Sequence, residues 1–140
     1  MNMVKRYMRG GLAALALMLP ALSLGAQTPM SAEEFETYVT GRTLTFGSGG
    51  APYGVEEFRP GRRTLWAFIG DECREGSWFP RDEQICFVYD DAPGSEHCWI
   101  FWRSDRGLNA RFMGDTSDTE LYEVENSPRP LICHGPEVGV

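Results

Sequence analysis

Apolar and polar residues alternate along short stretches from residue 42 to residue 124, and turn-forming residues separate these stretches. A period of two is the pattern of a strand with one buried face. The pattern predicts eight strands, over residues 42–46, 53–58, 63–69, 73–79, 84–89, 97–102, 108–113 and 120–124. Because the intervening turns are short, we expect a mainly β protein, an antiparallel meander that closes into a small barrel or folds over as a sandwich.

One short helix is predicted ahead of the strands, over residues 31–41. Ser31 and Glu34 have the spacing of a capping box, and Gly41 is a typical stop residue after a helix. Phe35 lies on the apolar side of this segment. A helix of this length is marginal alone, so we expect it to pack on the sheet.

The hairpin of residues 84–89 and 97–102 departs from simple alternation, because both of its faces carry large apolar side chains. Both faces must therefore be covered, and we expect the helix to cover the outer one. The alternative is that part of the outer face stays exposed and binds a partner. Residues 47–52, GSGGAP, lack the spacing of a phosphate-binding loop and are expected to form a flexible loop.

Residues 1–26 are expected to be a secretory signal peptide that is removed. Lys5, Arg6 and Arg9 precede an apolar run, and small residues follow at Gly25 and Ala26. The remaining residues 27–140 are long enough for a single domain with one core. We therefore expect a periplasmic or secreted protein that has no membrane segment after cleavage.

The charge of residues 27–140 excludes several classes of function. Three of the 13 basic residues lie in the expected signal peptide, which leaves 10 arginines and no lysine against 20 acidic residues. Such an acidic surface argues against nucleic acid or anionic membrane as partners, since both attract clustered cations. The absence of lysine removes Schiff-base chemistry and phosphate-loop nucleotide binding.

Four cysteines in an exported chain predict two disulfides. Three pairings are possible, and we prefer Cys86–Cys98, within one hairpin, together with Cys73–Cys133. Counting residues across the turn of this hairpin places Cys86 and Cys98 on opposite faces of the sheet. Their pairing is therefore expected to need a bulge or a different turn length.

Candidate catalytic and metal-binding residues are few. The only histidines are His97 and His134, each next to a cysteine that is expected to be oxidised. No serine lies in a nucleophile-elbow pattern, and no C-x-x-C spacing indicates zinc. We assign no catalytic residue, no metal site and no cofactor, and an enzymatic role is disfavoured.

An interior cavity is the better candidate for a site. A closed sheet of eight strands either fills itself with side chains or holds one small ligand. The tryptophans could line such a cavity, although buried aromatic rings more often fill a core. The candidate ligand-binding residues are Trp66, Trp78, Trp99 and Trp102.

Gly76-Ser77-Trp78 matches the G-x-W signature of lipocalins. In lipocalins the motif lies on the first strand after an N-terminal helix, whereas here it falls on the fourth, so no binding residue is carried over. The order of signal peptide, short helix, glycine-rich loop, G-x-W strand and cysteine-containing hairpin resembles small exported β-barrel proteins of Gram-negative bacteria. That resemblance implies no particular activity.

These observations favour a non-enzymatic periplasmic or secreted domain that acts by binding. The expected partner is a protein, such as an envelope hydrolase that it inhibits, or a small apolar ligand. The alternative is a small cell-envelope hydrolase that uses surface carboxylates.

Overall fold

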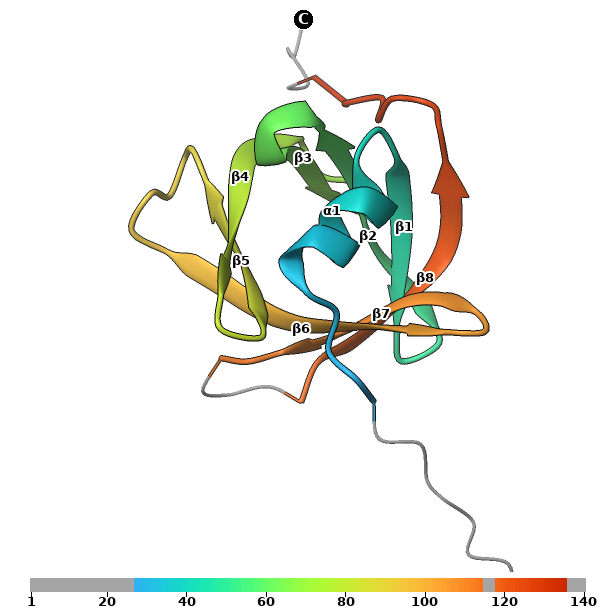
Figure 1. The fold of residues 1–140 in the computed structure, drawn as a ribbon. Helices are drawn as coiled ribbons and strands as arrows, with labels where there is room; N and C mark the ends of the chain where they lie inside the picture. The colour runs from blue at the N-terminus through green and yellow to red at the C-terminus, as the bar shows by residue number, and fades with distance from the viewer. Residues whose placement is uncertain (1–26, 115–117, 136–140) are drawn as a thin grey trace, which may run out of the picture.

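The computed structural model describes residues 27–114 and 118–135, so the expected signal peptide lies outside the described residues. Eight antiparallel strands follow one another around a closed barrel, in which β8 pairs with β1 (Figure 1). The mainly β prediction is confirmed, in its barrel form. The elements are α1 (Ala32–Val39), β1 (Thr43–Ser48), β2 (Ala51–Arg59), η1 (Pro60–Arg62), β3 (Arg63–Phe68), β4 (Arg74–Arg81), β5 (Gln84–Tyr89), β6 (Glu96–Ser104), β7 (Gly107–Phe112) and β8 (Glu120–Ser127).

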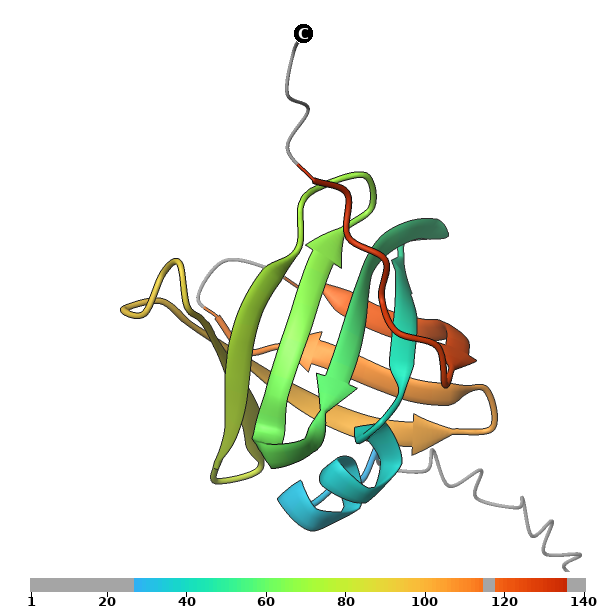
Figure 2. The ribbon, with the colours of Figure 1, turned by 90° about the horizontal axis from the view of Figure 1, so that it is seen from above.

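The helix α1 closes one end of the barrel, where it lies at the centre of the ring of strands in Figure 1 and beyond the strand ends in Figure 2. Its capping box is formed as predicted: the Glu34 N–H donates to Ser31 Oγ at 3.2 Å, and the Ser31 N–H donates to Glu34 Oε2 at 2.8 Å. Phe35 and Val39 point into the core and are fully buried. Within the described residues no helix is long and apolar enough to cross a membrane.

Replacing Ser31 with alanine is expected to lower the free energy of unfolding by about 1 kcal/mol, because the first turn of α1 loses its side-chain acceptor. Urea denaturation measures this change. Ser31→Asp is the matched control, because it keeps an acceptor at the cap and is expected to retain most of the stability. Equal losses in both variants would contradict a capping role.

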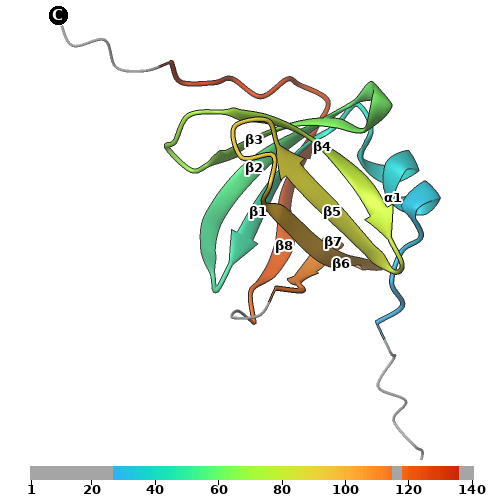
Figure 3. The ribbon, with the colours of Figure 1, turned by 90° about the vertical axis from the view of Figure 1, so that its left-hand side faces the viewer.

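The expectation that the helix covers the outer face of the β5–β6 hairpin was wrong. Figure 3 shows α1 at the end of the barrel and the outer side of β5 and β6 without a helix over it. The physical reason is that a helix of two turns has a narrow apolar stripe, which fills the barrel end. The outer face instead carries a disulfide and Trp102, which is only 8% exposed. Beside Trp102 the N-terminal segment runs along β6, where the Met30 N–H donates to the Phe101 carbonyl at 2.8 Å.

The structure contains both of the preferred disulfides, Cys86–Cys98 and Cys73–Cys133. Cys86 and Cys98 are directly opposite each other on β5 and β6, with their Cα atoms 4.0 Å apart. The expectation that they lie on opposite faces was therefore wrong. Val88 pairs with Glu96, so the connection over residues 89–95 brings both cysteines to the outer face without a bulge.

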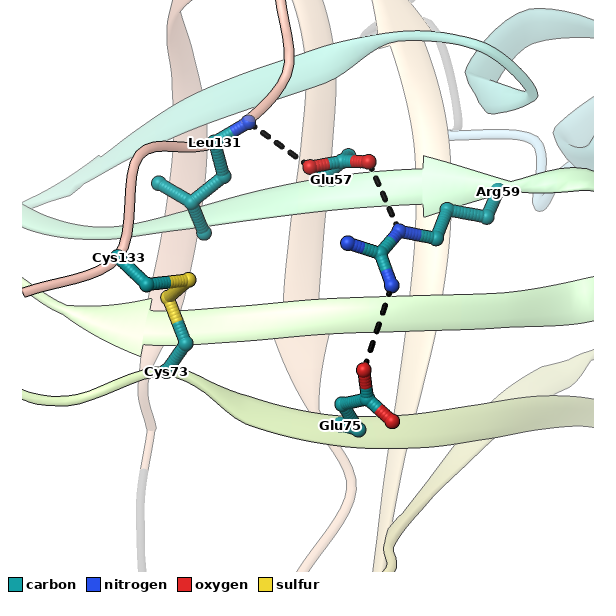
Figure 4. Close-up of a disulfide and its surroundings, with 6 residues drawn as sticks. All are labelled: Glu57, Arg59, Cys73, Glu75, Leu131 and Cys133. Atoms are coloured by element: carbon teal, nitrogen blue, oxygen red, sulfur yellow. Dashed lines mark hydrogen bonds and ion pairs between the residues drawn. A yellow bond between two sulfur atoms is a disulfide. The ribbon is translucent and has the colours of Figure 1, made fainter. Parts of the chain in front are cut away.

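The second disulfide fastens the C-terminal strap, which we define as residues 128–133. Figure 2 shows this segment returning from the end of β8 across the outside of the barrel. On its way the Leu131 N–H donates to Glu57 Oε2 at 2.8 Å, and Cys133 then bonds to Cys73 (Figure 4). Because the two cysteines are 60 residues apart, the cross-link contributes about 4 kcal/mol in the chain-entropy model.

The glycine-rich stretch 47–52 is mostly strand, which corrects the prediction of a flexible loop. Only Gly49 and Gly50 lie between β1 and β2, with φ angles of 57° and 85°. Two consecutive residues at positive φ are what a tight two-residue hairpin turn requires. The flanking residues of this stretch therefore continue the two strands.

Candidate functional site

A cavity of about 90 Å³ lies inside the barrel, toward the end opposite α1. Phe58 and Phe101 form its floor and contact Phe35 of α1 on their other side. Phe68, 41% exposed, stands at the mouth, so the cavity reaches the solvent. The complete lining is Phe46, Tyr53, Glu56, Phe58, Trp66, Phe68, Arg74, Phe87, Tyr89, His97, Trp99, Phe101 and Leu121.

Glu56 is the acidic member of a mostly aromatic wall. On β2 the side chains of Glu56 and Phe58 point inward, while Glu57 points outward to the C-terminal strap. Glu56 stands directly opposite Trp66 of β3 and is only 5% exposed. A carboxyl so deeply buried needs hydrogen-bond partners to offset the loss of water.

A β-bulge brings Tyr53 to the mouth of the cavity. Phe46 pairs with Gly54 and Gly47 pairs with Pro52, which leaves Tyr53 as the extra residue of β2. An extra residue in one strand of a pair changes the direction in which the local side chain points. The Tyr53 ring centroid lies 5.9 Å from that of Trp66 and 5.5 Å from that of Phe68, so the three rings form one side of the mouth.

Gly76 makes room for Tyr89 to reach across the sheet. The two residues are opposite each other on β4 and β5, and a Cβ on Gly76 would lie 2.9 Å from Tyr89 Cδ1. Without that Cβ, the Tyr89 hydroxyl extends to β2 and donates to Glu56. Trp78 of the same motif faces the other end of the barrel, with its ring centroid 5.1 Å from that of Phe35. Within the G-x-W motif, Gly76 therefore lies against the cavity residue Tyr89, and Trp78 lies against Phe35 of the helix.

The environment of Glu56 favours its protonated form at neutral pH. Burial raises its pKa to about 8, although hydrogen bonds from Thr64 and Tyr89 act in the opposite direction. The geometry agrees, because Thr64 Oγ1 lies within hydrogen-bond reach of both Glu56 Oε1 and the Glu57 carbonyl, the latter at 3.2 Å. A hydroxyl has one proton to donate. Thr64 therefore shares this proton between the Glu56 carboxyl and the Glu57 carbonyl, which gives Glu56 only part of a hydrogen bond to offset the burial of a charge.

Arg74 and His97 form the polar part of the rim. The Arg74 guanidinium donates to both carboxylate oxygens of Asp91, at 2.8 and 2.7 Å, and stands 4.6 Å from the Tyr89 ring centroid. His97 Nε2 lies 3.4 Å from Ser95 Oγ, beyond the range of about 2.6–3.2 Å expected for a nucleophile and its base. These contacts hold the side chains of the rim in place, and they do not form a pair of nucleophile and base.

The structure places the four tryptophans in three different environments. Trp66 and Trp99 line the cavity. Trp78 lies in the core against α1, and Trp102 lies on the outer face of β6. Sequence reasoning missed Glu56, although a signal was present: two adjacent glutamates in a strand must point to opposite faces, so one of them faces the core.

Across residues 27–114 and 118–135, no group of three or more His, Cys, Asp or Glu side chains is arranged to hold a metal ion. No protein-family model, curated protein or solved structure matches this chain.

Proposed function

We propose that this protein is a periplasmic or secreted binding protein that holds one small apolar ligand in the barrel cavity and catalyses no reaction. The observation that carries the proposal is the aromatic cavity around the buried carboxyl of Glu56. Small-molecule sites are typically concave and apolar, with a few polar groups that orient the ligand. The two disulfides are compatible with an oxidising, extracellular compartment, which supports the proposed location.

The dimensions of the cavity favour a ligand of about one ring. Its volume of about 90 Å³ is below the roughly 150 Å³ of an engineered cavity that binds benzene. It is also far below the roughly 300–1,000 Å³ of pockets for drug-sized molecules. Because the mouth is open at Phe68, part of the ligand can extend into solvent. We therefore expect a single-ring body that carries one polar group.

The surface carboxylates support binding rather than hydrolysis. Asp90 pairs with Arg63, Asp91 with Arg74 and Glu96 with Arg81. The hydrogen bonds from these arginines hold the pKa of each carboxyl below its usual range. A general acid for hydrolysis needs the opposite change, a pKa raised toward the operating pH.

Binding in this cavity can be tested through the indole N–H signals of the four tryptophans in ¹H–¹⁵N NMR spectra. Trp66 and Trp99 line the cavity, whereas Trp102 lies on the outer face. Titration with toluene, benzyl alcohol and benzylamine, up to about 10 mM, covers weak fragment binding. We expect at least one probe to shift the signals of Trp66 and Trp99 in a saturable manner.

Trp102 is the internal control of this titration, and its signal is expected to stay in place. A Leu121→Phe variant, which adds volume at the cavity wall, is expected to weaken the shifts. The proposal is contradicted if no probe moves Trp66 or Trp99, or if the probes move Trp102 instead.

A further inference from the structure

We propose that the natural ligand is a small organic cation, an ammonium group on an apolar or single-ring body, which Glu56 binds as a carboxylate after releasing its proton to the solvent. This inference rests on the proposed ligand-binding function and specifies the charge of the ligand. It is carried by the placement of one buried carboxyl among aromatic rings, together with the charges of the surrounding wall.

The aromatic rings provide the first argument. Tyr53, Trp66 and Phe68 stand on one side of the mouth, and Tyr89 and Trp99 belong to the strands across from them. The faces of such rings attract a cation, most strongly in a site shielded from water. A neutral apolar ligand needs no such concentration of tyrosine and tryptophan, because aliphatic side chains bury it equally well.

Glu56 also has no cation paired with it among the residues that line the cavity. The wall contributed by β1, β3 and β8 carries no titratable side chain. The titratable residues of the other strands are Tyr53 on β2, Arg74 on β4, Tyr89 on β5 and His97 on β6. Arg74 is paired with both oxygens of Asp91, and the groups that act on Glu56 are the hydroxyls of Thr64 and Tyr89.

These hydroxyls prepare the site for an ionised carboxylate. When Glu56 loses its proton, Thr64 and Tyr89 can both donate to it, and an ammonium group supplies the missing positive charge. A buried carboxylate without such a partner would be strongly disfavoured. One cation therefore enters for each proton that leaves to the buffer, and the net charge of the cavity is unchanged by binding.

The test compares benzylamine, which is protonated at neutral pH, with benzyl alcohol, which has nearly the same shape and no charge. At pH 8.5 we expect benzylamine to bind at least about tenfold more tightly. Glu56→Gln keeps the shape of the side chain and removes its charge, so it is expected to abolish this preference. Glu75→Gln, on the exposed face of β4, is the matched control and is expected to retain the preference.

Proton release provides a second measurement that uses only the wild-type protein. Calorimetric titration at pH 6.5, in two buffers with different ionisation enthalpies, counts the protons released. We expect about one proton per benzylamine, because the pKa of Glu56 is about 8. Benzylamine affinity should rise about tenfold per pH unit up to that value and then level off.

Each outcome separates the two proposals. If benzylamine and benzyl alcohol bind equally and both move the signals of Trp66 and Trp99, the cation inference fails and the binding function stands. Benzylamine binding without proton release at pH 6.5 also overturns the inference. If neither compound moves these signals, both proposals fail.

Discussion

Replacing Phe35 with alanine is expected to lower the free energy of unfolding by about 3–5 kcal/mol. The ring is 0% exposed and carries the contact between α1 and the barrel interior. Its centroid lies 5.1 Å from that of Trp78 and 4.5 Å from that of Phe101, so its removal leaves a void that rigid neighbours cannot fill. Denaturation in guanidinium chloride, followed by tryptophan fluorescence, measures the change.

Thr37→Ala is the matched control, since Thr37 is an exposed residue of the same helix. It is expected to change the stability by less than about 0.5 kcal/mol. A loss below about 1 kcal/mol for Phe35→Ala would show that the barrel end is closed by other contacts and that the helix is dispensable.

The stability of the wild-type protein, measured relative to Glu56→Gln, is expected to fall as the pH rises from about 5 to about 8. In the unfolded chain Glu56 ionises near its ordinary pKa of 4.5, whereas in the folded protein it keeps its proton up to about 8. Between these values the folded state holds one more proton, so each pH unit costs about 1.4 kcal/mol. The variant stays neutral, and near pH 8.5 it should be the more stable protein by about 3–5 kcal/mol.

Urea denaturation at pH 4.5, 6.5 and 8.5 checks this expectation, since the difference between the two proteins cancels the titration of every other group. Glu75→Gln, at an exposed position, is expected to stay within about 0.5 kcal/mol of the wild type at each pH. A constant difference between the wild type and Glu56→Gln would mean that Glu56 ionises normally in the folded protein.

The strands and the helix follow from local patterns in the sequence. The predicted strand over residues 84–89 has the bounds of β5, because alternation and flanking turn residues agree there. The helix cap at Ser31 was equally predictable from the sequence, because it depends on two side chains three residues apart. The closure of the sheet was left open between barrel and sandwich, because it depends on the pairing of β1 with β8, which are remote in the chain.

The site was less predictable because it depends on irregularities of register. Tyr53 faces the cavity because of a β-bulge, and no residue pattern in β2 predicts this bulge. Tyr89 acts on Glu56 across the barrel because Gly76 leaves room for its ring, a relation that involves β2, β4 and β5. The predicted position of α1 was wrong for a similar reason. An apolar stripe shows that a helix face is buried, but it does not show which apolar surface the helix packs against.

The path of the C-terminal strap determines how the molecule would bear a mechanical load. A pulling force applied beyond Cys133 passes through the sulfur bridge to Cys73, next to the first residue of β4, before it reaches β8. The hydrogen bonds between β8 and β1 are therefore protected from breaking one after another under this force. Reduction of the disulfide would remove this protection, and the same force would then separate β8 from β1 first.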